Sequence, residues 1–197
     1  MKLIYKGIFK DMGQLPTGNL PQNAIKFKEP DNFVKLNLYA FLYGIPAYLL
    51  TILIVVTSTI LHDKPVPNFH FVGIILAFLT VLPHEILHAI GFGKGAEVEL
   101  YFSPKNLVAF VACTKPVSKG RFIFLSLLPN LVFGWLPLII WALMPGYGVY
   151  SNILYTFSVM GVLFGAGDYM NIFNAIFQMP KGSMQQLSGF NSYWFMP

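Results

Sequence analysis

Four long apolar segments constrain this chain more than any other feature of its sequence. They run over about residues 36–61, 71–93, 122–144 and 149–177, and Gly, Pro, Asn or charged residues bound each one. A bilayer core about 30 Å thick is crossed by roughly 20 apolar residues in a helix that rises about 1.5 Å per residue. Each segment is long enough to cross, so we predict a mainly α-helical membrane protein, a bundle of four transmembrane helices.

The composition agrees with this fold class and divides the chain into three parts. Hydrophobic residues make up 55% of the 197 positions and charged residues only 11%, whereas charged residues make up about 25% of a soluble domain. We expect a cytosolic N-terminal appendage at 1–32, a four-helix membrane domain at 33–180, and a cytosolic C-terminal tail at 181–197. The aromatic residues at 193–195 are typical of an interfacial anchor.

The distribution of basic residues predicts the orientation of the helices. Twelve of the thirteen Lys and Arg residues lie before the first apolar segment, between the second and third, or after the fourth, and only Lys64 lies on the other side. The positive-inside rule therefore places both termini and the segment 94–121 in the cytoplasm, at the cell membrane. Because the basic residues are spread over several loops, we expect anionic membrane lipid as their partner, and no nucleic acid.

Two β-hairpins are predicted on the cytosolic side. Residues 3–10 and 24–29 alternate polar and apolar side chains around a Gly-, Pro- and Asn-rich connection, which indicates an N-terminal hairpin. Residues 97–102 and 107–113 flank a Ser-Pro-Lys-Asn sequence that is typical of a tight turn. This second hairpin would lie between helices two and three.

The second apolar segment contains the sequence His84-Glu85-Ile-Leu-His88. Side chains four residues apart share one face of a helix, so both imidazoles can bind one Zn²⁺ at about 2.0–2.1 Å. Zinc would lower the pKa of a bound water, and Glu85 would accept its proton as the general base. The alternative is a hydrogen-bonded His-Glu-His cluster that only joins helices. A charge at the bilayer centre costs about 2.5–3.5 kcal/mol, which favours the functional interpretation.

Asp168 is the candidate third metal ligand, since catalytic zinc typically takes three protein ligands. His84 and His88 lie 13 and 17 residues beyond Phe71, and Asp168 lies about 18 residues beyond Tyr150, in a segment that crosses in the same direction. The predicted depths agree within one helical turn. A carboxylate that caps the cytoplasmic end of the fourth helix, or pairs with a lysine, is the alternative.

Three further polar or helix-bending residues lie near this predicted depth. Asn130 could hydrogen-bond a substrate backbone or an oxyanion, or could simply join helices. Asn171 could orient the Asp168 carboxylate, or cap the end of its helix. Pro83, directly before the metal-binding motif, predicts a kink that opens space for water.

Together, the His84-Glu85-x-x-His88 motif in one membrane helix and Gly167-Asp168 in a later one resemble the site-2 protease type of intramembrane metalloprotease. The sequence resembles more closely a bacterial family of small, four-helix, zincin-type membrane peptidases of unknown function. This resemblance covers most of the chain, from the first helix to the fourth. It implies that His84, His88 and Asp168 bind zinc and that Glu85 is the general base.

The resemblance also implies a function: a zinc-dependent, membrane-embedded endopeptidase that cleaves a membrane-protein or peptide substrate near the cytoplasmic leaflet. Such enzymes often bind the substrate as an extended strand at a sheet edge, and the 97–113 hairpin could supply that edge. The alternative is a hairpin that only connects helices two and three. Two other functions stay open, a non-catalytic membrane scaffold with a structural metal site and a small metal transporter. No oligomeric state is predicted.

Overall fold

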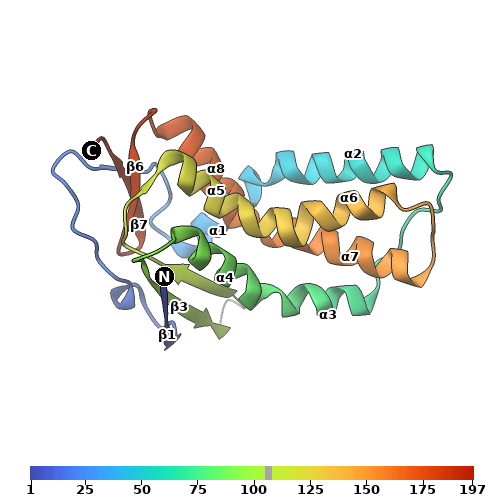
Figure 1. The fold of residues 1–197 in the computed structure, drawn as a ribbon, viewed down its shortest axis with the longest axis horizontal. Helices are drawn as coiled ribbons and strands as arrows, with labels where there is room; N and C mark the ends of the chain where they lie inside the picture. The colour runs from blue at the N-terminus through green and yellow to red at the C-terminus, as the bar shows by residue number, and fades with distance from the viewer. Residues whose placement is uncertain (105–107) are drawn as a thin grey trace.

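The computed structural model describes residues 1–104 and 108–197, which are mainly helical with two small sheets at one end (Figure 1). The α-helices are α1 (Phe33–Tyr43), α2 (Ile45–Leu61), α3 (Phe71–Leu79), α4 (Val81–Phe92), α5 (Lys119–Asn130), α6 (Leu136–Leu143), α7 (Val149–Phe164) and α8 (Ala166–Gln178). The strands are β1 (Lys2–Ile8), β2 (Ile25–Lys26), β3 (Glu97–Ser103), β4 (Val108–Ala112), β5 (Val117–Ser118), β6 (Met184–Ser188) and β7 (Asn191–Phe195). A 3-10 turn, η1, covers Met12–Gln14.

Each predicted transmembrane segment folds as two consecutive helices. The chain breaks at Gly44 between α1 and α2, at Thr80 between α3 and α4, and at Gly165 between α7 and α8, while the π-helix η3 (Leu131–Trp135) joins α5 to α6. The break at Gly165 bends α8 by 48° relative to α7. Three of these segments are long and apolar enough to cross a membrane, or four when the bent pair counts as one span.

The breaks divide the helices into two levels (Figure 1). Helices α2, α3, α6 and α7 form a bundle away from the sheets, whereas α1, α4, α5 and α8 lie beside them. The sequence of the distal bundle contains no charged residue and no histidine. Large apolar side chains on it face outward, and Leu53, Ile60 and Leu143 are between 60% and 72% exposed. Such an extensive apolar surface is typical of a protein face that contacts lipid.

The predicted hairpin between the second and third segments is confirmed. Strands β3 and β4 pair antiparallel, with Leu100 opposite Val111, in a sheet of order β1-β3-β4. Residues 105–107, which include part of the predicted turn, lie outside the described residues. Helix α4 packs on this sheet through Ala89, which is fully buried against Ala96, Val98 and Cys113. The sheet thereby fixes the helix that carries the His-Glu-x-x-His motif.

The predicted N-terminal hairpin is wrong. Strand β1 pairs parallel with β3, with Lys2 beside Glu97, and β2 pairs antiparallel with β7, with Ile25 opposite Trp194. The connection from β1 to β2 therefore runs from one sheet to the other instead of turning back. Hairpin loops usually have two to five residues, and this connection is much longer, so local pairing has no advantage over pairing with distant strands.

The segment predicted as a C-terminal tail forms strands β6 and β7. They belong to a second sheet of order β2-β7-β6-β5. Trp194 packs against a core cluster that includes Phe27 and Phe122, and Phe195 is 9% exposed. These two aromatic side chains therefore contribute to the packing of the protein itself, although alternation along β7 places them on opposite faces of the sheet.

Glu29 links the N-terminal segment to this second sheet. Its Oε1 atom accepts a hydrogen bond from the Ser192 backbone N–H at 2.8 Å. Burial disfavours the ionised carboxylate, and it raises the pKa of Glu29 to about 7. The contact between β7 and the segment that follows β2 therefore includes a carboxyl group whose pKa is near neutral.

Candidate metal centre

The His-Glu-x-x-His motif lies at the start of α4, just after the break at Thr80. Pro83 has no backbone N–H, so it cannot donate to the carbonyl of Leu79 one turn earlier. The helix axis changes at Thr80, and the His84 N–H then bonds to the Thr80 carbonyl at 2.8 Å. The helix break associated with Pro83 thus lies at Thr80, one turn before the first histidine of the motif.

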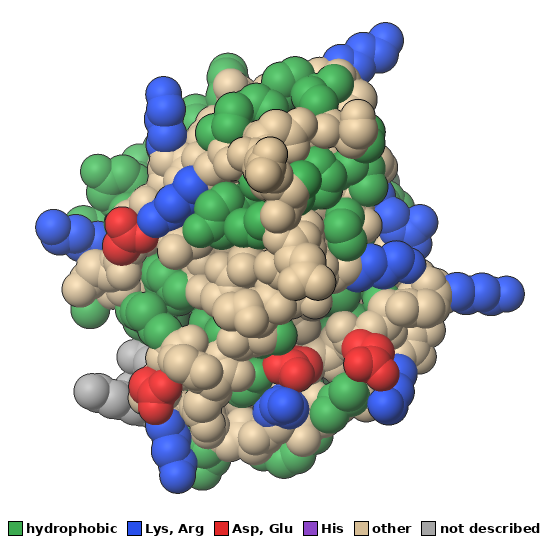
Figure 2. Space-filling view, turned by 90° about the vertical axis from the view of Figure 1, so that its left-hand side faces the viewer, with side chains coloured by type: hydrophobic (Ala, Val, Ile, Leu, Met, Phe, Trp, Pro, Cys, Tyr) green, Lys and Arg blue, Asp and Glu red, His purple; other side chains and the backbone are tan. Residues whose placement is uncertain are grey.

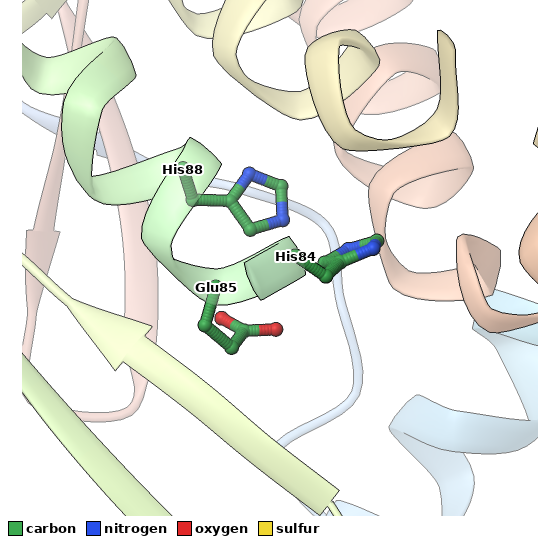
Figure 3. A group of neighbouring side chains, drawn as sticks. All are labelled: His84, Glu85 and His88. Atoms are coloured by element: carbon green, nitrogen blue, oxygen red, sulfur yellow. The ribbon is translucent and has the colours of Figure 1, made fainter. Parts of the chain in front are cut away.

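The two imidazoles lie on one face of α4, as the spacing predicts. Their ring centroids are 4.9 Å apart, and both residues are buried. Figure 3 shows both rings on the side of α4 that faces the neighbouring helices, whereas the Glu85 side chain lies on the side that faces the strands. One nitrogen of each imidazole and one Glu85 oxygen all lie within 4.8 Å of one another.

Asp168, from the first turn of α8, contacts both imidazoles. Its Oδ2 lies 3.1 Å from Nε2 of His84, and its Oδ1 lies 3.1 Å from Nε2 of His88. Asp168 follows the bend at Gly165, and the helix N-terminus favours a negative charge at this position. The structure therefore brings together all three residues predicted to bind the metal.

Asn130 and Asn171 occupy different places around Asp168. The side-chain amide of Asn130, at the end of α5, donates to Asp168 Oδ2 at 2.8 Å and to the Ser126 carbonyl at 3.0 Å. Asn130 is fully buried, so it orients the carboxylate and has no solvent-exposed face. Asn171, predicted as the orienting residue, instead lines the cavity beside the site.

His88 is also fixed from its other ring nitrogen. Its Nδ1 lies 2.8 Å from the backbone carbonyl oxygen of Leu125, on α5. A carbonyl can only accept, so Nδ1 must carry the hydrogen, and Nε2 is the atom that faces Asp168. The sequence motif alone did not indicate this contact, because the partner is a backbone atom.

Glu85 does not share the Asp168 contact. The backbone N–H of Val111, on strand β4, donates toward its carboxylate. This hydrogen bond comes from the edge strand of the first sheet, since the order is β1-β3-β4 among the described residues. Glu85 therefore lies between helix α4 and the edge strand β4.

Glu85, both imidazoles, Asp168 and Asn171 border one cavity of about 440 Å³. Its wall is mostly apolar and comes from α1, β4, α5, α8, β6 and the connection after β1. The lining includes Phe9, Leu15, Phe33, Leu36, Ala40, Phe92, Val108, Phe110, Leu125, Phe164, Leu187 and Phe190, together with the polar side chains of Asn37, Ser126 and Gln185. The sequence did not predict that the N-terminal connection reaches this cavity.

The donor set fits a zinc ion. Two imidazole nitrogens and a carboxylate are ligands that catalytic zinc takes, and a further position would open to the cavity. Ligand atoms on tetrahedral zinc with bonds of 2.0–2.1 Å lie about 3.3 Å apart. The observed nitrogen–oxygen distances of 3.1 Å are close to this spacing. Each ring nitrogen of His88 also faces a hydrogen-bond acceptor, the Leu125 carbonyl at Nδ1 and Asp168 Oδ1 at Nε2. A neutral imidazole has only one N–H and can satisfy only one of them. A cation bound between Nε2 and Asp168 would satisfy the other.

The comparison with known protein families agrees with this donor set. Residues 77–184, more than half of the chain, match the model of a family described as "Putative zincin peptidase". The chain belongs to this zincin family. The matched region contains the His-Glu-x-x-His motif, Asn130 and Asp168, and the match confirms the resemblance to a family of zincin-type peptidases. No curated protein and no solved structure matches the zincin-family chain.

Proposed function

We propose that this zincin-family protein is a zinc-dependent, membrane-embedded endopeptidase, similar in mechanism to the site-2 protease type. The observation that carries the proposal is the contact of one buried carboxylate, Asp168, with both imidazoles of the motif, next to a cavity that Glu85 also borders. His84, His88 and Asp168 would hold the metal. Family membership supports a metallopeptidase that uses zinc.

Glu85 is the residue we assign to proton transfer. A zinc ion, when bound, lowers the pKa of a water molecule and polarises a substrate carbonyl. The Glu85 carboxylate takes the proton of the attacking water and returns it to the leaving amine. The N–H of Val111 holds the carboxylate in place, and the apolar cavity wall limits access of other water.

The edge of β4 supports binding of the substrate as an extended strand. Val111 directs its N–H away from β3 and toward Glu85, so alternation along the strand directs the Ala109 N–H outward as well. A peptide that pairs with the outward N–H of Ala109 would lie alongside Glu85. The apolar wall of the cavity would accept large hydrophobic side chains of a membrane-protein substrate.

Ala109→Pro tests this binding mode because it removes an outward N–H without removing a bond to β3. We expect the variant to bind zinc normally and to lose cleavage, while Ala109→Val, which keeps the N–H, stays active. Normal cleavage by Ala109→Pro would contradict substrate binding at the β4 edge.

The proposed depth of the site is near the cytoplasmic leaflet of a bacterial cell membrane. Thirteen residues separate Phe71 from His84, which corresponds to about 20 Å along a helix, or roughly two-thirds of a hydrocarbon core about 30 Å thick. Both termini lie at the sheet end (Figure 1), and Lys and Arg side chains surround the rim of that end (Figure 2). Basic residues at this end favour a cytoplasmic position.

The experiment that tests the function compares wild type with Glu85→Gln in cells, by sequencing the new N-termini of membrane proteins. We expect wild type to generate new N-termini and Glu85→Gln to generate none, although both bind zinc equally. Glu97→Gln, at an exposed glutamate in β3, is the matched control and should behave as wild type. Identical N-termini from wild type and Glu85→Gln would refute the peptidase assignment and favour a scaffold with a structural metal.

A metal-transport function has less support. The distal bundle of α2, α3, α6 and α7 contains no ionisable side chain apart from tyrosine. An ion that crosses a membrane needs polar groups along its path, and here the candidate metal ligands gather at one level.

A further inference from the structure

The Leu125 carbonyl that holds His88 is unusual for a carbonyl inside a helix. In an α-helix, the carbonyl of residue 125 accepts the N–H of residue 129. Residue 129 is Pro129, which has no N–H. The ring of a proline also clashes with the carbonyl four residues earlier and tilts it away from the helix axis. The oxygen of Leu125 is therefore free to accept a hydrogen bond from a donor on a neighbouring helix. His88 Nδ1 lies 2.8 Å from it.

The packing of α4 on α5 brings this carbonyl within reach of His88. Gly91 lies one turn after His88, and a Cβ atom added there would lie 2.6 Å from Cβ of Leu125. No side chain other than hydrogen fits at this contact. Arg121, also on α5, donates from Nε to the Gly91 carbonyl at 2.7 Å, which holds the end of α4 against α5.

We infer that Pro129 is a positioning residue for the metal centre, and that it acts through the Leu125 carbonyl on His88. The carbonyl fixes the hydrogen on Nδ1 and the orientation of the ring, and so presents the Nε2 lone pair toward Asp168. Partners of this kind commonly change metal affinity by 10–100-fold when they are lost. The inference rests on the proposed role of His88 as a zinc ligand.

Pro129→Ala is the direct test, because alanine restores the helical N–H donor at position 129. Alanine is a better helix former than proline. If Pro129 only shapes the helix, Pro129→Ala should leave the thermal stability of the metal-free protein equal or higher. We expect zinc affinity, measured by competition with a chelator, to fall by about 10–100-fold. Pro137→Ala is the matched control, because Pro137 lies in the same segment at the start of α6, and it should bind zinc as wild type.

The ring N–H signal of His88 gives a readout that does not depend on activity. In protein labelled with ¹⁵N-histidine, this signal is identified by its loss in His88→Ala. We expect it to shift and to exchange faster with solvent in Pro129→Ala. Gly91→Ala, which forces α4 and α5 apart, should reproduce both effects and serves as the test if Pro129→Ala does not fold.

Wild-type zinc affinity together with an unchanged His88 signal in Pro129→Ala would overturn the inference. A wild-type protein that binds no zinc would instead refute the proposed function. In that case the inference is tested by the His88 ring N–H signal of the metal-free protein alone. A shift of this signal in Pro129→Ala supports the role of Pro129, and an unchanged signal overturns it.

Discussion

Replacement of Asn130 by leucine should weaken zinc binding without unfolding the protein. The Asn130 amide donates to Asp168 Oδ2 at 2.8 Å and is fully buried. A hydrogen bond to a charged group contributes about 1.5–3 kcal/mol, and 1.4 kcal/mol corresponds to a tenfold change in affinity. We therefore expect the zinc dissociation constant of Asn130→Leu to rise by about 10–100-fold. Leucine has a similar volume, so the substitution leaves little cavity.

The assay is competition between the purified protein, in mild detergent, and a chelator of known zinc affinity. Asn174→Leu is the matched control, because Asn174 is also buried in a helix but bonds to Gln178 instead of Asp168. Its zinc affinity should stay within about threefold of wild type. Equal affinities for wild type and Asn130→Leu would refute the argument that Asn130 orients the metal-binding carboxylate.

The remaining predictions concern other contacts. Gly165→Ala would place a Cβ atom 1.5 Å from Asn130 Oδ1, so we expect it to lower zinc affinity in the chelator competition. Because both substitutions disturb the same contact, the double variant with Asn130→Leu should lose less affinity than the sum of the two single losses. Glu85→Gln should keep zinc, measured by metal analysis, and lower the cleavage rate by about 10²–10⁴-fold. The pKa of Glu29 is raised to about 7 from 4.5, so its contribution to stability is present below pH 4.5 and is lost as the pH rises to 7. Thermal unfolding should show a loss on the order of 3 kcal/mol over this range, which is absent in Glu29→Gln. Lys64→Met removes donors to the carbonyls of Trp141 and Ala142 at the end of α6, so the unfolding free energy should fall by about 1–3 kcal/mol with zinc affinity unchanged.

The sequence predicts which candidate residues come together where the relevant information is local or follows from helix geometry. The spacing of His84 and His88 places both on one face of any α-helix. The depth of Asp168 follows from counting residues along two segments that run in the same direction, because the rise per residue is nearly constant. The structure places Asp168 within 3.1 Å of both imidazoles.

The sequence does not predict features that depend on distant backbone pairing. The alternating pattern of β1 is compatible with many partners, and its parallel pairing with β3 depends on the folded arrangement of helices and sheet. The Leu125 carbonyl is likewise absent from any side-chain motif. Pro129, four residues later, was the only local signal for it, since a proline always leaves a carbonyl without its helical donor.

The central claim is a metal centre with His84, His88 and Asp168 as ligands and Glu85 outside the ligand set. The most direct measurement is the zinc content of purified wild type, Asp168→Ala and Glu85→Gln, by mass spectrometry in mild detergent. We predict one zinc per chain in wild type and in Glu85→Gln, and none in Asp168→Ala. Zinc retained in Asp168→Ala but lost in Glu85→Gln would contradict the account, because it would make Glu85 the third ligand.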